Sequence, residues 1–547
     1  MTDALSQAYA EYLEGTYDSP DRIVLNAYFR QGHIPGGFRN WWRELYGNDD
    51  ELDDAHLMRL AGRFSRRLRA YAKKEGIPVI DCKPSDRKAE IAKKHVPKNP
   101  NFVGVFAVLV GRASAPAWHI HKTKDGYIQN IVRKYPFVNH YYFHIMDPDW
   151  GHVTVRMSGH PPFGSQIILN GHEYIAAQAK KAGLSFQKEG NCFTAVSHST
   201  ELAQMAETLC SQNIVGPLRQ LCDRWLYSSC LCFVLSLAEQ EQTGFRYDYS
   251  IYQLEYSRNL LFERGMQMEQ LVEALIDRTR TKLDVKRLKT IFGAKRRPFR
   301  QQGHKQPRLE VVTERPVYNL TVFKIHFGHL TLKLYTKGAN VLRCEVIVHN
   351  TKALKTQRSL PNFPTIVAQL KAVLVRFLDH LHYIDPCFMA DDTLDTLAEA
   401  AYLGQTRMAG IDLNKPRMRA VLEAIVSLAP SPKGFIVSDL AAKVRDILNL
   451  SQDQYQSRHA AYDLKKFRAK AWLHKIGKSR RYQATPEGLR TMSALLILRE
   501  KVIKPVLAGA GKPKRGPKPK HQSPVDVLYQ AIQFAMHNLF QMLGIAV

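Results

Sequence analysis

The chain lacks an apolar run long enough to cross a lipid bilayer. Its most hydrophobic short stretch, residues 231–238, is interrupted by Ser and Cys, whereas a spanning helix needs roughly 20 consecutive apolar residues. The first residues, MTDALSQAYAEYLEG, lack a basic start followed by an apolar core, so we expect no secretory signal there. The sequence therefore predicts a cytoplasmic protein without a membrane partner.

Cysteine is also scarce, with eight residues among 547. That usage is typical of a reducing compartment and does not indicate a disulfide framework. Cys230 and Cys232 form a C-x-C motif with Cys222 upstream, but no second cluster follows at zinc-ligand spacing. We therefore expect buried thiols in a helix rather than a metal site.

Acidic residues are few relative to basic ones, because 50 Asp and Glu stand against 78 Lys and Arg, a formal net charge of +28. Such an excess favours a polyanionic partner, with nucleic acid as the first expectation and an anionic membrane as the second. Hydrophobic residues make up 45% of the chain, which excludes a wholly disordered protein.

The length is that of about three to four structural units. We expect a multidomain α+β protein with a helical N-terminal region, a mixed α/β central body with antiparallel hairpins, and a C-terminal winged helix. The expected segments are a helical/α-β N-terminal region (1–100), a His-rich α/β domain (101–200), a helical region (201–290), a basic linker (291–310), a β-hairpin plus helix domain (311–410), a winged-helix domain (415–508), a basic Pro/Gly tail (509–523) and a C-terminal amphipathic helix (524–547).

The order of elements near the C-terminus is typical of a DNA-binding module. Residues 434–448 predict a helix capped by Ser438, residues 454–476 predict a second, longer helix, and a short basic strand and a closing helix follow. This order resembles the winged helix, which lays one helix in the major groove of DNA. The apolar stripe expected to face the core consists of Tyr462, Leu464, Phe467 and Leu473.

Basic side chains on this module predict contacts with phosphates or base edges. They are Lys465, Lys466, Arg468 and Lys470 on the second helix and Arg480 and Arg481 on the wing. Two further basic segments predict electrostatic anchoring: an arm over residues 278–308, which includes Arg296 and Arg297, and a tail over residues 511–521. The tail is similar to a minor-groove hook, and a plain basic linker is the alternative.

Seven of the 21 histidines lie between residues 119 and 172. A hairpin with its loop at residues 147–151 would place six polar side chains on one face of the sheet and apolar side chains on the other face. The expected cross-strand pairs are His144 with Thr154, Tyr142 with Arg156, and His140 with Ser158. This face predicts a surface that contacts a nucleic-acid backbone, with Arg156 as one phosphate ligand.

The sequence His119-Ile120-His121 offers a different interpretation. Alternation along a strand places both imidazoles on one face, and this pattern resembles the metal motif of the HUH nickases that start rolling-circle replication and transposition. The resemblance implies a divalent cofactor, Mg²⁺ or Mn²⁺, and a tyrosine nucleophile, for which Tyr174 is the candidate. However, no lysine follows Tyr174 by three or four positions. Further candidate ligands or carboxylates are His140, His144 and Glu173.

Residues 330–349 predict another hairpin, with Tyr335 opposite Arg343 and Lys333 opposite Glu345. The run LYTK followed by LRCE resembles a segment of phage and plasmid replication initiators. In a functional interpretation of this hairpin, Lys337 and Arg343 bind phosphates while Glu345 orients them or holds a metal. The alternative is a ladder of cross-strand ion pairs on an exposed sheet.

The motifs NHYYFH, DPDWGH, HPPFG and NGHEY, together with the C-terminal module, resemble a broad group of uncharacterised bacterial proteins of mobile elements or plasmids. That resemblance implies no established activity and identifies no catalytic residues. Three hypotheses remain open: a DNA-binding factor without catalysis, a metal-dependent replication-initiator or transposase-like nickase, and a structured-RNA-binding protein; DNA is preferred to RNA. The C-terminal helix fits either pairing of two protomers or packing on its own chain, so the oligomeric state stays open.

Overall fold

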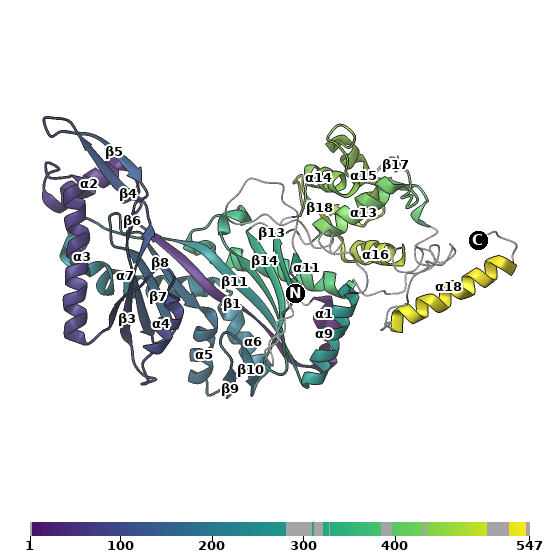
Figure 1. Cartoon of the computed structure of the whole chain (residues 1–547), viewed down its shortest axis with the longest axis horizontal. Coiled ribbons are helices and arrows are strands. Elements are labelled where there is room, and N and C mark those ends of the chain that lie inside the picture. Colours follow the sequence, from purple (N-terminus) through teal and green to yellow (C-terminus); the bar gives the residue numbers. More distant parts are fainter. Residues whose placement is uncertain are drawn as a thin grey trace.

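A computed structural model of the chain describes residues 3–280, 309–310, 321–327, 329–383, 396–429, 431, 434–499 and 524–542. Helices surround one large mixed sheet, and a smaller, mostly helical unit follows it (Figure 1). The fold is therefore of the expected α+β class. Within the described ranges, no helix combines the length and apolar character needed to cross a membrane.

The sheet has eleven strands in the order β12-β13-β14-β15-β11-β1-β8-β7-β6-β3-β2. The strands are β1 (Leu13–Tyr28), β2 (Val79–Asp81), β3 (Gly104–Ser114), β6 (Phe137–Asp147), β7 (Gly151–Ser158), β8 (Ser165–Asn170), β11 (Asp248–Phe262), β12 (Leu309–Glu310), β13 (Thr321–Phe327), β14 (Leu330–Lys337) and β15 (Val341–Val348). The β2–β3 pair is parallel, and the other neighbours pair antiparallel. Two small hairpins stand beside it: β4 (Ala117–Lys122) with β5 (Ile128–Lys134), and β9 (Phe186–Lys188) with β10 (Phe193–Val196).

The two longest strands, β1 and β11, pair with each other in the middle of the sheet. Both lie in segments that the sequence reading expected to be helical. Pro20 sits in β1 at a register shift of this pair, a position where the missing proline N–H leaves the ladder intact. Through β1 and β11, strands from residues 1–100, 101–200, 201–290 and 311–410 join one sheet, so these segments do not form separate sheets.

Helices cover this sheet and share one core with it, which extends from Leu5 to Leu381. Helix α3 illustrates why they form: Asp53 caps its start by accepting from His56 N at 2.6 Å, and Gly76 ends it with φ 68°. The helices are α1 (Ala4–Ala8), α2 (Pro35–Tyr46), α3 (Asp54–Glu75), α4 (Lys88–Lys94), α5 (Gly171–Lys181), α6 (Ser199–Thr208), α7 (Val215–Ser229), α8 (Leu237–Gln242), α9 (Gly265–Arg280) and α11 (Phe363–Tyr383).

The described residues between 396 and 499 form what we term the C-terminal unit, which has a hydrophobic core of its own. Its elements are β16 (Ala401–Leu403), β17 (Thr406–Met408), α13 (Pro416–Leu428), α14 (Val437–Leu448), α15 (Ser457–Ala469), β18 (Leu473–Lys475), β19 (Tyr482–Ala484) and α16 (Pro486–Ile497); α18 (Pro524–Met542) follows later in the chain. Helix α14 begins at Val437, so Ser438 lies inside the helix and the predicted Ser438 cap is wrong. Instead, Ile436 N donates to Asp439 Oδ2 at 3.0 Å.

Both predicted hairpin registers are confirmed. In the first hairpin, His140 pairs with Ser158, Tyr142 with Arg156, and His144 with Thr154. In the second, Tyr335 pairs with Arg343 and Lys333 with Glu345. The apolar face expected for the first hairpin is buried: Tyr141, Phe143, Ile145, Val153, Val155 and Met157.

Candidate nucleic-acid interfaces

A row of polar side chains crosses five neighbouring strands on one face of the large sheet. Strand register places Ser250, Asn26, Gln166, Arg156 and Tyr142 next to one another. Gln166 Nε2 donates to Asn26 Oδ1 at 3.0 Å, and Arg156 Nη1 donates to Gln166 Oε1 at 3.4 Å. This polar row brings Arg156, a predicted phosphate ligand, to the centre of a hydrogen-bonded surface.

Four residues of the polar row, Ser250, Asn26, Gln166 and Arg156, line a groove of about 690 Å³. Four cationic side chains line it, and no Asp or Glu is among the lining residues, all of which belong to the described chain: Arg133, Arg156, Lys352 and Arg358. The Arg156 guanidinium also lies over the Tyr142 ring, 5.7 Å from its centroid. A concave surface with four cations and no carboxylate creates a positive potential that attracts anions.

Histidines add little charge to this groove. Burial, together with the nearby Arg156 charge, lowers the pKa of His140 to about 4. His144, farther along β6 on the same face, has its pKa lowered to about 4 by burial and by the His152 ring, whose Nε2 lies 3.0 Å from His144 Nδ1. Both imidazoles are therefore neutral at neutral pH, and arginine and lysine supply the positive charge.

The second hairpin contributes its arginine to the core. The Arg343 side chain is 0% exposed, pairs with Asp21, and donates to Asn259 Oδ1 at 3.0 Å. His172 Nδ1 lies 2.8 Å from the same Asp21 carboxylate. Burial alone would raise the pKa of Asp21, but Arg343 and His172 lower it below its usual value.

The other residues expected to act with Arg343 are also held inside or at the edge of the sheet. Glu345 is 3% exposed and accepts from Tyr335 Oη at 2.8 Å. Lys337 ends β14 and is half-buried. The alternative interpretation was a ladder of cross-strand ion pairs on an exposed sheet. Lys333 Nζ lies 3.6 Å from Glu345 Oε1 and forms such a pair, but this pair is largely buried.

The predicted metal motif lies on β4, with the His119 and His121 ring centroids 4.5 Å apart. His119 pairs with one carboxylate, that of Asp54. Across the residues with assigned positions, no group of three or more His, Cys, Asp or Glu side chains could hold a metal ion. The candidates His140 and His144 lie on β6 and make the separate contacts given above.

The predicted nucleophile and its neighbour contact a different set of residues. The Tyr174 ring packs on Trp150 with centroids 4.4 Å apart, and burial raises the pKa of the Tyr174 phenol. Glu173 pairs with Lys188 at 2.5 Å. The contacts of Tyr174 and Glu173 are thus separate from those of His119, and they are typical of packing at the start of α5.

One face of α15 is exposed along its length. Arg458, Tyr462 and Lys465 recur at helical spacing and are exposed, with Lys466 half-buried beside them. Tyr462 is 48% exposed, and Lys466 Nζ lies 5.3 Å from its ring centroid. The prediction that Tyr462 faces the core is therefore wrong, while Leu464, Phe467 and Leu473 are buried as expected.

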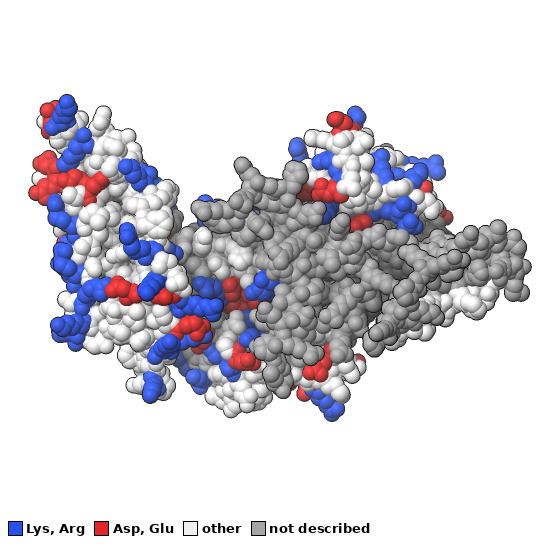
Figure 2. Space-filling model, in the orientation of Figure 1, with Lys and Arg blue, Asp and Glu red and all other residues white. Residues whose placement is uncertain are grey.

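The remaining predicted cations of this unit occupy different positions. Arg468 is half-buried at the edge of α15, and Lys470 Nζ donates to the Thr396 carbonyl. Arg480 is exposed in the turn between β18 and β19, while Arg481 Nη1 donates to Gly434 O at 3.2 Å. Figure 2 shows Lys and Arg side chains gathered over the C-terminal unit. Arg296, Arg297 and the tail at 511–521 lie outside the described residues.

Sequence reasoning overlooked several residues of these two surfaces. Arg458 and Tyr462 belong to the exposed face of α15, and their spacing of four and then three to Lys465 is the signal that identifies them. Arg133, Lys352 and Arg358 come to the groove from segments far apart in sequence, which no local pattern reveals. Comparison with protein-family models, with curated proteins and with solved structures finds no match for the chain.

Proposed function

We propose that the protein binds DNA and that the C-terminal unit is a winged helix with α15 as its recognition helix. The element order supports this: α13, α14 and α15 precede the β18–β19 hairpin, and Phe435 bridges to Tyr482 as a short third strand. In such modules, one helix enters the major groove and the wing contacts the backbone.

The observation that carries the proposal is the set of cations without protein partners on this unit. Arg458 and Lys465 on α15, and Arg480 in the adjoining turn, are exposed and make no hydrogen bond or ion pair with any described residue. Cations without protein partners are available to neutralise DNA phosphates, and this neutralisation releases the counterions condensed on the DNA. Tyr462 between them offers a ring and a hydroxyl to the same ligand.

The groove on the sheet face contributes a second phosphate-binding surface in this proposal. Lys352 and Arg358 are likewise without side-chain partners in the described part of the chain, and Arg156 Nε is buried without a hydrogen bond. Contacts with the phosphate backbone position DNA without reading its sequence. In this proposal the groove therefore anchors the DNA, and α15 recognises the base sequence. The resemblance of the four motifs to proteins of mobile elements or plasmids favours a role of this chain in a mobile element or replicon.

The alternative of a metal-dependent nickase has less support, because His119 pairs with a single carboxylate, that of Asp54, and Tyr174 packs on Trp150 instead. Sequencing the nucleic acid that co-purifies with the chain distinguishes DNA from RNA. We expect duplex DNA, and co-purification of one structured RNA would contradict the proposal.

Fluorescence anisotropy with a labelled mixed-sequence duplex at low salt tests the interface. The triple variant Arg458→Ala/Lys465→Ala/Arg480→Ala should bind about a hundredfold more weakly, because three phosphate contacts are lost. The matched control Lys73→Ala/Lys74→Ala/Lys94→Ala removes the same charge from exposed positions on α3 and α4 and should bind nearly as tightly as the wild type. Equal losses in both variants would reduce the effect to net charge and refute the assignment to α15.

A further inference from the structure

We propose that the protein has a binding site for a small organic cation, such as an aromatic or alkyl ammonium compound, in the pocket between α3, α7 and the sheet. The pocket has a volume of about 580 Å³, within the range of small-molecule sites. Strand alternation places it on the sheet face opposite the polar row, because Phe143 lines the pocket while Tyr142 belongs to the row. The site is thus separate from both proposed DNA-binding surfaces and does not depend on them.

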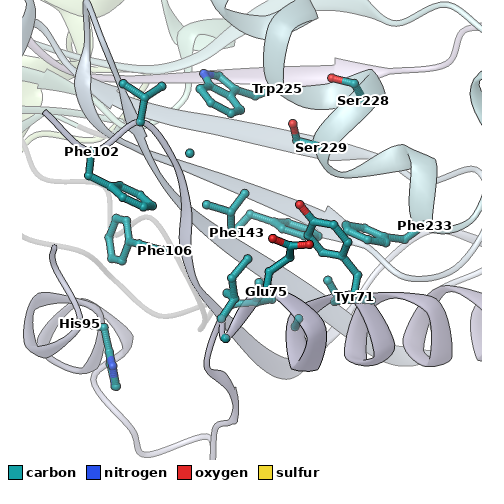
Figure 3. A pocket seen from close by; sticks show the side chains of 18 of the residues that line it. Tyr71, Glu75, His95, Phe102, Phe106, Phe143, Trp225, Ser228, Ser229 and Phe233 are labelled. Carbon is teal, nitrogen blue, oxygen red and sulfur yellow. The ribbon is translucent and has the colours of Figure 1, made fainter.

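Aromatic rings supply much of the pocket wall. Figure 3 shows Glu75 reaching toward a space bordered by Phe102 and Phe106 on one side and by Tyr71 and Phe233 on the other. The six aromatic lining residues are Tyr71, Phe102, Phe106, Phe143, Trp225 and Phe233. The face of an aromatic ring carries negative potential and attracts a cation placed over it.

The charge of the pocket points the same way. In a chain of net charge +28, no Lys or Arg is among its lining residues, all of which lie in the described chain. Glu75 brings a carboxylate that makes no hydrogen bond or ion pair with any described side chain. Burial raises the pKa of the Cys232 thiol, so that group stays neutral. An anionic amphiphile would be repelled here, whereas an organic cation gains both the carboxylate and the rings.

The walls of the pocket are held by contacts of their own. Trp225 Nε1 donates to Asp147 Oδ2 at 2.8 Å, which fixes the indole. Phe143 and Phe233 lie nearly parallel, at 3° with centroids 6.1 Å apart, and Phe143 is fully buried. A preformed wall loses little conformational freedom when a ligand enters, so the pocket is suited to binding without rearrangement.

Ligand-observed NMR titration of the full chain tests the site with benzyltrimethylammonium and with neopentylbenzene, its neutral isostere. We expect saturable binding of the cation and at least about fivefold weaker binding of the isostere, because the isostere lacks the charge that the rings and Glu75 attract. Equal binding of the two probes, or no saturable binding of the cation, would overturn the proposal.

Two variants localise the effect. Glu75→Gln should weaken binding of the cation about fivefold while leaving the isostere unchanged, and Tyr71→Ala should weaken binding of both probes. Both positions are exposed, so the fold should persist, as circular dichroism would verify. The control Glu241→Gln removes a carboxylate at an exposed position on α8 and should leave the affinity for both probes unchanged. A Glu75→Gln variant that binds the cation as tightly as this control would contradict the proposed site.

Discussion

The large sheet and the C-terminal unit use their arginines in opposite ways. In the sheet, Arg343 and Arg258 are buried and paired with carboxylates, so they hold strands together. In the C-terminal unit, Arg458 and Arg480 are exposed and have no partner among the described side chains. A net charge of +28 therefore describes two populations of cations, and only one of them is available to a polyanion.

The largest expected effect is on stability. Arg343→Met should lower the free energy of unfolding by about 3–5 kcal/mol, because it leaves the buried Asp21 carboxylate without its main counter-charge. Urea denaturation measures the change, with Arg480→Met as the exposed control, for which we expect less than about 0.5 kcal/mol. A small effect of Arg343→Met would show that the buried pair does not hold the sheet.

The second prediction concerns pH and again involves the sheet. The pKa of His144 falls from 6.5 to about 4 in the folded chain, so its neutral burial stabilises the fold above pH 6.5. That contribution is lost progressively as pH falls from 6.5 to about 4 and amounts to on the order of 3 kcal/mol. Unfolding free energy measured from pH 7 to 4 should fall less steeply in His144→Gln than in the wild type. His198→Gln, at an exposed position, should keep the wild-type slope; a His144→Gln curve parallel to it would contradict the prediction.

The third prediction ranks the two proposed DNA-binding surfaces. Arg156→Ala/Arg358→Ala should weaken duplex binding about tenfold. This loss is smaller than that from the triple variant of the C-terminal unit, because two phosphate contacts are removed instead of three. Anisotropy titrations at one low salt concentration compare the two variants, with Lys73→Ala/Lys74→Ala as the control for net charge. A larger loss from the groove variant would reverse the ranking and make the sheet the principal interface.

The smallest expected effect separates surface from core on α15. Tyr462→Ala should change the free energy of unfolding by less than about 1 kcal/mol, because the side chain is 48% exposed. We expect duplex binding to weaken about threefold through the lost ring contact. Chemical denaturation and anisotropy on the same preparation measure both quantities. A loss of stability of about 3–5 kcal/mol is typical of a buried aromatic residue, and it would contradict the exposed position of Tyr462.

Local patterns predicted the parts of the fold whose register is determined by short turns. The cluster DPDWG sets the pairing of His144 with Thr154, and Gly338 in the next hairpin sets that of Tyr335 with Arg343. Strands β1 and β11 were missed because their partners lie more than 200 residues apart in sequence. Pro20 adds to the difficulty, because a proline is typical of an edge strand or a bulge, and β1 holds it at a register shift of the β1–β11 pair.

The candidate site was predictable to a similar degree. Arg156 was found because its hairpin partner, Tyr142, is close in sequence, whereas Arg133 and Arg358 reach the same groove only through the fold. The sequence around Arg343 predicts a surface cation, because nothing near it in sequence indicates that it pairs with Asp21 on β1. Sequence patterns thus give the faces of single elements, while pairing between distant elements decides which charges stay exposed.

The salt dependence of duplex binding tests the central claim most directly. The slope of log affinity against log salt concentration should be smaller in magnitude by about 2–3 in Arg458→Ala/Lys465→Ala/Arg480→Ala than in the wild type, since each lost phosphate contact removes about 0.9. The same slope in both proteins, or wild-type binding that does not respond to salt, would contradict the account.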